Sequence, residues 1–173
     1  MVKTMIVLAC LFVLIIATNT EGPLKDIHSK PPWVTSSTIE LIEHFEGKRH
    51  KAYRDSEGNW TIGVGHLIKQ QTRHLLHREL SEDEVMGILH QDLRVCSEAL
   101  ERSLNVALKR TQIDALHSLC HNIGPDNFSR SDVVKYLNKG EVEKAGNAFM
   151  NWTTPPVLKK RRQAERDLFL TEI

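Results

Sequence analysis

This sequence has almost no net charge. Its 173 residues carry 23 Lys and Arg against 22 Asp and Glu, a formal net charge of +1. Proteins that bind nucleic acid neutralise phosphates with a clear basic excess, so the composition gives no electrostatic case for a nucleic-acid partner. Any attraction to an anionic polymer must come from a local basic patch.

The common metal and redox motifs are also missing. The nine His residues are scattered with no H-E-x-x-H, and no C-x-x-C occurs among three cysteines. These absences exclude the usual zinc-protease and dithiol patterns. We therefore expect no metal and no organic cofactor.

Long apolar stretches are scarce, and the one long run lies at the start of the chain. Lys3 precedes the apolar residues 5–17, and small and polar residues follow at 17–22. This pattern predicts a signal peptide over residues 1–22, since the run is a few residues short of a membrane span. An uncleaved anchor is the alternative. We expect a secreted, monomeric protein without stable membrane association.

Removal of that segment would leave two cysteines. Cys10 has the preceding residues of a lipoprotein cleavage site, but the apolar run continues for seven residues beyond it, so lipidation is not expected. Cys96 and Cys120 permit one disulfide in an exported protein. Both fall on apolar faces of predicted helices, so two buried free thiols are equally compatible.

Residues 23–34 contain three prolines and predict a linker or extended arm, and residues 35–173 predict one globular domain. A capping box from Ser37 to Glu40 predicts a first helix, which Gly47 ends. A second box at 81–84 predicts a long helix that reaches residue 100. Further helices are expected from Thr111 to residue 124, around 131–138 and 141–151, and after Pro155-Pro156.

Between residues 52 and 66 the helical period disappears. Tyr53, Trp60, Ile62 and Val64 favour strands, and residues 55–58 predict a turn with Gly58 in the left-handed conformation. The fold class is therefore α+β, mainly α. A small lobe over about 47–79 would be joined by the long helix to a helical lobe, with a cleft between them.

A helix end followed at once by a hairpin can bring two carboxyl groups and a hydroxyl close together. Glu46 ends the first helix, where the helix dipole and burial beside Phe45 would raise the pKa of its carboxyl. Asp55 in a polar turn would stay ionised, and Thr61 could orient a water. Glycoside hydrolysis needs such a pair. On spacing alone, however, Glu46 also fits an exposed helix end and Asp55 a simple turn former.

A family resemblance favours the first interpretation. Residues 46–66 (EGKRHKAYRDSEGNWTIGVGH) resemble the active-site segment of phage-type lysozymes, glycoside hydrolase family 24. The family pattern is a Glu-Gly, a Tyr and an Asp, a Gly turn, and Thr-Ile-Gly-x-Gly-His. Similarity continues through residues 112–131 and 152–168, so it covers nearly the whole chain after residue 35.

The resemblance implies a two-lobed lysozyme-like fold that cuts the β-1,4 bond between N-acetylmuramic acid and N-acetylglucosamine in bacterial peptidoglycan. It makes Glu46 the general acid, Asp55 the group that activates water or stabilises the transition state, and Thr61 the group that positions water. The family inverts configuration, which requires carboxyls about 6.5–9.5 Å apart. By position, Leu67 and Ser131 would line the sugar cleft; so would His121, where the family usually has an aromatic residue.

Several other charged residues have a structural and a functional interpretation. Arg161 or Arg162 could approach Glu46 and orient it while lowering its pKa, or could lie on the surface. For His66 we favour a buried pair with an acid of the long helix, such as Asp92, over a metal site. For the basic run 159–162 we favour a solvated helix face over wall-phosphate binding.

Three rival functions remain open at this stage. They are a chitin-directed glycosidase, an inactive glycan-binding homologue, and a membrane-disrupting basic helix over 157–170. Sequons begin at Asn59, Asn127 and Asn151. A glycan on Asn59 would crowd Thr61, so we predict that Asn59 is unmodified in active protein. Host defence, digestion and phage-driven lysis would all use the same reaction.

Overall fold

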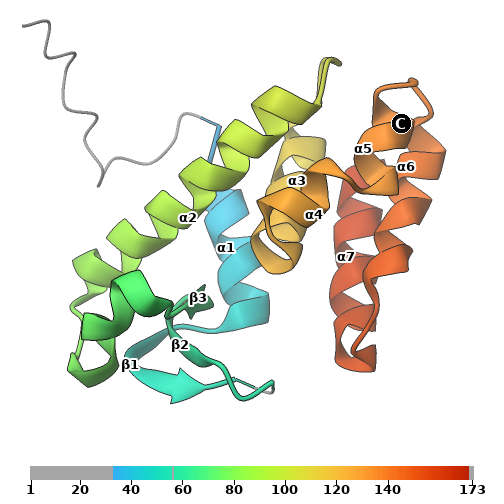
Figure 1. Cartoon of the computed structure of the whole chain (residues 1–173). Coiled ribbons are helices and arrows are strands. Elements are labelled where there is room, and N and C mark those ends of the chain that lie inside the picture. Colours follow the sequence, from blue (N-terminus) through green and yellow to red (C-terminus); the bar gives the residue numbers. More distant parts are fainter. Residues whose placement is uncertain (1–32, 56, 172–173) are drawn as a thin grey trace, which may run out of the picture.

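The computed structural model describes residues 33–55 and 57–171, so the expected signal peptide and most of the expected arm lie outside the described residues. Helices dominate, and one small sheet sits at one end of the long helix α2 (Figure 1). The α-helices are α1 (Ser36–Glu46), α2 (Glu82–Ser103), α3 (Arg110–Ile123), α4 (Pro125–Ser129), α5 (Asp132–Leu137), α6 (Val142–Ala148) and α7 (Lys159–Leu170). The 3-10 helices are η1 (Gln70–His77), η2 (Phe149–Trp152) and η3 (Pro156–Leu158).

The sheet is an antiparallel meander in the order β1-β2-β3. It consists of β1 (Arg49–Arg54), β2 (Trp60–Gly63) and the two-residue β3 (His66–Leu67). Tyr53 pairs with Thr61. At the hairpin turn the Gly58 amide donates to the Asp55 carbonyl at 3.0 Å, and Gly58 has φ +84°. The predicted hairpin is confirmed; β3, η1 and α4 were not predicted.

The start of α1 differs from the expected capping box. The N-cap is Thr35 rather than Ser37, and its partner three residues on is Thr38 rather than Glu40. The carboxylate of Asp114 on α3 reaches this end and accepts hydrogen bonds from the hydroxyls of Ser37, at 2.8 Å, and Thr38. A negative group is favoured at a helix N-terminus. Asp114, 76 positions after Thr38, thus adds a tertiary contact to the locally capped start of the helix.

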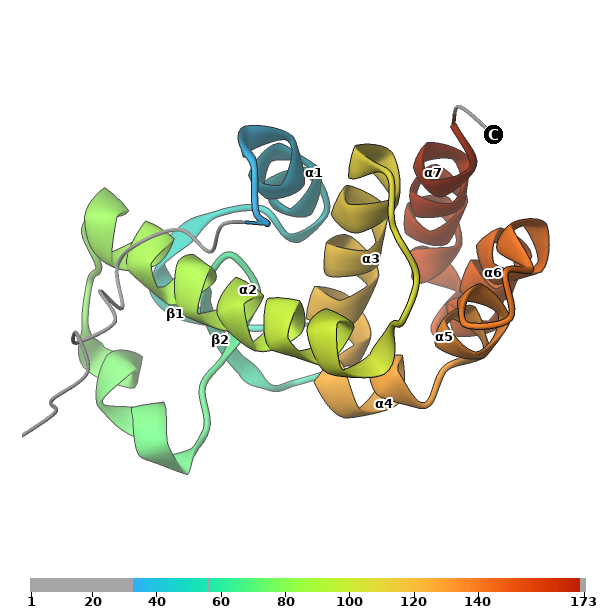
Figure 2. The ribbon, with the colours of Figure 1, turned by 90° about the horizontal axis from the view of Figure 1, so that it is seen from above.

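Two apolar cores divide the molecule, and α2 contributes to both. The first half of α2 packs Val85, Leu89 and Leu93 against the sheet. Together with Ile42 of α1 and Ile62 of β2, these side chains form the sheet-lobe core. The second half of α2 packs with α3 to α7 into the helical-lobe core, which contains Phe128, Phe149 and Phe169. The two-lobed arrangement with a connecting helix is therefore confirmed (Figures 1 and 2).

Other boundaries move by a few residues. Val34, which we expected in the linker, is 1% exposed and belongs to the sheet-lobe core. The capping box at Ser81 and Glu84 is confirmed. The third long helix begins at Arg110 with Lys109 as its N-cap, one residue before the expected Thr111. The expected 141–151 helix divides into α6 and η2.

A disulfide joins the two helices that carry the expected cysteines. Cys96 of α2 and Cys120 of α3 are bonded, with 5.8 Å between their Cα atoms. The open question of one disulfide or two thiols is thus settled in favour of the disulfide. It crosses the centre of the helical-lobe core, where both residues are buried.

The interpretation of residues 159–162 as a solvated face is wrong for its second half. Arg161 and Arg162 are 4% and 0% exposed. Both guanidinium groups pair with the buried carboxylate of Glu165, Arg161 at 2.9 Å and Arg162 at 2.8 Å. Over residues 33–55 and 57–171, no helix combines the length and apolar character needed to cross a membrane.

Candidate active site

Glu46 lies at the point where α1 ends and the sheet begins. The helix stops because Gly47 takes φ +69°. One carboxylate oxygen, Oε1, accepts a hydrogen bond from the Arg161 guanidinium at 2.6 Å. The other oxygen, Oε2, faces Gly65, where a Cβ atom would lie 2.9 Å away. The site therefore requires glycine at position 65 as well as a carboxyl at position 46.

The structure reverses our expectation for the acidity of Glu46. Burial raises the pKa of its carboxyl, as expected, but contacts with His121 and Arg161 outweigh burial and lower the pKa to about 2. The sequence showed the helix end and the burial. It offered Arg161 or Arg162 as a partner that would lower the pKa, but it left a surface position equally open; Arg161, 115 residues later in the chain, is the partner.

Asp55 and Thr61 lie side by side in the hairpin, as expected. The Thr61 hydroxyl is 3.5 Å from Asp55 Oδ2. The other oxygen, Oδ1, accepts from the backbone amides of Asn59 at 2.8 Å and Glu57 at 2.9 Å. Slight burial raises the pKa of Asp55, but these hydrogen bonds outweigh it and lower the pKa. Asp55 is therefore ionised at neutral pH.

Tyr53 connects the two carboxyl groups electrostatically. Its pKa is raised by burial first, then by the negative charge of Glu46 and, more weakly, of Asp55, against a lowering by Arg49. Both acids therefore act on one phenol on β1. Sequence reasoning gave Tyr53 and Gly65 no role, although both lie in the family pattern.

The three expected sugar contacts have different surroundings. Leu67 on β3 is 41% exposed and available to a ligand. The Ser131 hydroxyl is buried and accepts from the Val134 amide, so it caps α5. The side chain of His121 is 5% exposed, and its Nδ1 lies 3.5 Å from Glu46 Oε1. His121 thus contacts the candidate acid itself.

The expected partner of His66 is confirmed. Its Nδ1 lies 2.9 Å from the carboxylate of Asp92 on α2, so this pair fixes the end of the sheet to the long helix. Of the two arginines considered, Arg161 reaches Glu46, whereas Arg162 bonds Asn122 at 3.0 Å and Glu165. Within the described ranges, no three His, Cys, Asp or Glu side chains gather in a way that could hold a metal ion.

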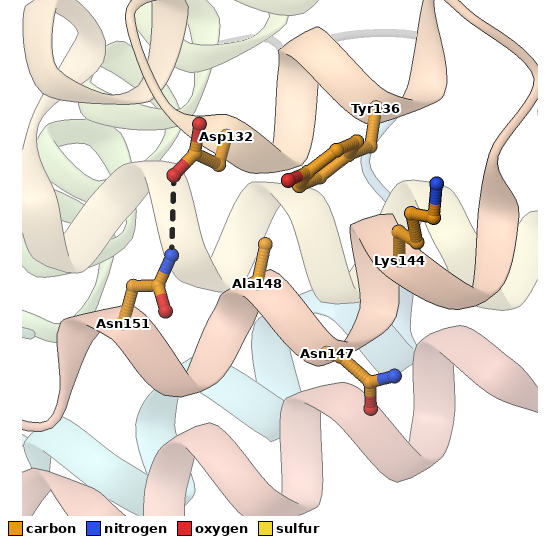
Figure 3. A pocket seen from close by; sticks show the side chains of 6 residues that line it. All are labelled: Asp132, Tyr136, Lys144, Asn147, Ala148 and Asn151. Carbon is orange, nitrogen blue, oxygen red and sulfur yellow. Dashed lines mark hydrogen bonds between the residues drawn. The ribbon is translucent and has the colours of Figure 1, made fainter.

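Two cavities lie away from these residues. One, of about 260 Å³, is between α5 and α6; Figure 3 shows Asp132 and Asn151 facing each other at one end and Lys144 at the other. The second, of about 310 Å³, lies between α2, α3 and the segment that joins them. Neither cavity includes Glu46, Asp55 or Thr61.

The helical lobe, the small sheet and the carboxyl pair between them define a lysozyme-like glycosidase, and comparison with known proteins agrees. The phage lysozyme family model matches residues 43–165. The endolysin of Acyrthosiphon pisum secondary endosymbiont phage 1 is 35% identical over 145 residues, which cover 79% of this chain and 97% of the relative. The chain belongs to the phage lysozyme family and is a glycoside hydrolase of the lysozyme type.

Solved structures lead to the same family. The muramidase domain of SpmX from Asticaccaulis excentricus superposes with a TM-score of 0.68 at 34% identity and covers 80% of this chain and 97% of its own. A lysozyme variant of phage P22 gives a TM-score of 0.68 at 35% identity, with coverage of 80% and 98%. The expected fold class is thereby confirmed.

Proposed function

We propose that this protein is a secreted, monomeric muramidase that hydrolyses the β-1,4 bond between N-acetylmuramic acid and N-acetylglucosamine in bacterial peptidoglycan. Glu46 donates the proton to the leaving oxygen, Asp55 activates a water, and Thr61 positions that water. One observation carries the proposal: Glu46 is buried beside Arg161 and His121, whereas Asp55 is held by backbone amides of a hairpin turn, and the charges of both carboxyls act on Tyr53. Glycosidases give two carboxyls different roles through different environments. Here both pKa values are lowered, so the contrast lies in the contacts of the two groups.

The low pKa of Glu46 has a consequence for the donation step. With a pKa of about 2, Glu46 is a carboxylate in the free protein at neutral pH. Oε1 already accepts from Arg161, which has no proton-accepting atom, so the catalytic proton belongs on Oε2. Burial is already the largest single influence on this pKa. A sugar chain that displaces water from Oε2 would raise the pKa further and favour the protonated acid.

The stereochemical proposal is inversion. Asp55 accepts from two backbone amides on Oδ1, which leaves Oδ2 beside the Thr61 hydroxyl. A water held between Oδ2 and Thr61 would be deprotonated by Asp55 as it attacks the sugar carbon, while Glu46 protonates the leaving oxygen on the opposite face. Analysis of the anomeric form of the first product by NMR tests this step directly.

The test of the function compares wild type with Glu46→Gln on purified wall fragments. We expect Glu46→Gln to lower the rate by about 10²–10⁴, the usual contribution of a positioned general acid. Glu43→Gln is the matched control, because Glu43 lies on the same helix and pairs with Lys48 at 2.9 Å. If Glu46→Gln hydrolyses wall fragments as fast as Glu43→Gln, the assignment of Glu46 is wrong.

The rival functions predict different results in the same assay. A chitin-directed enzyme would turn over chitin faster than wall fragments, and an inactive glycan-binding homologue would bind them without release of reducing ends. Killing by the basic segment 157–170 would need its cations free, yet Arg161 and Arg162 are buried against Glu46 and Glu165. This burial favours the enzymatic proposal.

A further inference from the structure

His121 makes a contact that the proposed mechanism does not use. It lies in the last turn of α3, and its Nδ1 is 3.5 Å from Glu46 Oε1. Among the described residues, this buried nitrogen has no hydrogen-bond partner. At 3.5 Å the pair is a close charge contact rather than a well-formed hydrogen bond. A buried imidazole nitrogen aimed at a carboxylate is sensitive to the charge of both groups.

The surroundings make the charges of the two groups interdependent. Arg161 on α7 already occupies Glu46 Oε1 at 2.6 Å, with Glu165 behind it at 2.9 Å. On β1, burial raises the pKa of the Tyr53 phenol, and Glu46 is close enough for its charge to raise that pKa further. Arg161 is permanently charged. A protonated His121 therefore adds a second cation beside the same carboxylate oxygen and opposes protonation of Glu46.

We propose that His121 is a positioning residue that competes with Glu46 for one proton and thereby sets the acidic limit of wall hydrolysis. This inference rests on the proposed role of Glu46 as the acid. With His121 neutral, Glu46 can take the proton on Oε2 and donate it to the leaving oxygen. With His121 protonated by the same single proton, Glu46 stays a carboxylate and has no proton to donate to the leaving oxygen.

The two arrangements hold the same number of protons, so their ratio does not change with pH. Between the first and the second protonation of the pair, further acidification therefore does not increase the form with neutral His121 and protonated Glu46. The second proton, which also protonates Glu46, binds only near its pKa of about 2. Slight burial raises the pKa of Asp55, but its hydrogen bonds to the Asn59 and Glu57 amides lower that pKa overall, which works against an acidic limit set by that residue. Without His121, protonation of Glu46 would continue to rise as the pH falls.

The first experiment compares pH profiles of wall-fragment hydrolysis. His121→Asn places an amide nitrogen near the position of Nδ1 but cannot titrate, and His121→Phe restores an aromatic side chain of similar size. In the wild type we expect the rate to level off on the acidic side. In both variants it should keep rising by about tenfold per pH unit over the same range, because proton occupancy changes tenfold per unit.

The exposed His74 on η1 supplies the control, since His74→Phe should keep the wild-type profile. Profiles of His121→Asn and His121→Phe that run parallel to the wild type would overturn the proposal. So would a levelled profile in His121→Asn alone, because the hydrogen-bonding group rather than the proton would then matter.

A second measurement keeps the test independent of activity and of the variants' folding. NMR titration of wild-type protein labelled at Glu carboxyl carbons and His nitrogens should show coupled titrations, in which the Glu46 signal moves both in the step where His121 binds its proton and in its own step at low pH. Two independent titrations would overturn the inference. The proposed function fails separately, if Glu46→Gln stays active, and the NMR coupling is then still measurable.

Discussion

The two candidate acids are held in opposite ways. Glu46 is fixed by partners distant in sequence, with Arg161 on α7 at 2.6 Å and His121 on α3 at 3.5 Å. Asp55 is fixed within its own hairpin, by amides two and four residues further on. Both pKa values are lowered, but one by tertiary charges and the other by local backbone amides.

The difference shows which part of the site depends on the whole fold. The turn that holds Asp55 is encoded in five consecutive residues and would form wherever the hairpin forms. The ionic contacts of Glu46 form only when α1, α3 and α7 pack together. Substitutions at the Glu46 end should therefore change both activity and stability, whereas substitutions of turn residues other than Asp55 itself should have small and local effects.

The largest effect is expected from Arg161→Ala. It leaves Glu46 and the buried Glu165 without one of their cations, and breaking a buried pair in this way typically costs about 3–5 kcal/mol. It should also raise the pKa of Glu46, because Arg161 lowers it. Urea unfolding measures the first effect. Lys160→Ala, at an exposed position of the same helix, should lower the free energy of unfolding by less than about 0.5 kcal/mol. An equal loss in both variants would contradict the claim that the ionic contacts of Arg161 stabilise the fold.

The next prediction concerns how the free energy of unfolding depends on pH. The pKa of Glu46 falls from 4.5 to about 2 on folding, so its ionised form stabilises the protein above pH 4.5. That stabilisation, on the order of 3 kcal/mol, should be lost as the pH falls from 4.5 to about 2. Glu46→Gln should lack this part of the acid sensitivity. Identical slopes of unfolding free energy against pH for the two proteins would show that Glu46 is not held as described.

A smaller effect is expected when the space beside Glu46 is filled. Gly65→Ala places a Cβ atom 2.9 Å from the Glu46 carboxylate, and Gly140→Ala has the same positive φ with nothing within 4 Å. Both substitutions should cost roughly 1 kcal/mol of stability through the backbone. Only Gly65→Ala should also lower wall hydrolysis, by about 100-fold, because it displaces the acid. Equal activity in the two variants would refute the close approach.

The smallest effect is expected in the turn. Asn59→Ala removes the side-chain amide that lies 3.3 Å from Asp55 Oδ2, but the backbone amide on Oδ1 at 2.8 Å remains. One neutral hydrogen bond contributes about 1 kcal/mol, so activity should fall by no more than about fivefold. A loss as large as that of Gly65→Ala would mean that Asp55 is not held mainly by its backbone.

Sequence alone predicted what depends on neighbouring residues. The Gly47 helix end, the hairpin and the Ser81–Glu84 cap all form from contacts within a few residues. The pair of His66 with an acid of the long helix, such as Asp92, was also predicted, because no residue has the spacing of a metal partner for that histidine.

Failures of prediction share one cause, which is contact between distant segments. Asp114 contacts the first turn of α1, and His121 and Arg161 reversed the expected pKa shift of Glu46. The buried Arg161 and Arg162 were read as solvated because four consecutive basic residues are usually exposed. Only the packing of α7 against α3 shows that two of them face inward.

The attachment of α1 has a consequence for local unfolding. Its polar ends are tied to α3 through Asp114 and to α7 through Arg161, while Ile42 is buried in the sheet-lobe core. Partial opening of the helical lobe would therefore release both polar ends of the helix that carries Glu46, and opening of the sheet lobe would release its buried apolar face. In hydrogen exchange, the α1 amides should then open with whichever lobe is less stable, and the enzyme would be inactivated before it is globally denatured.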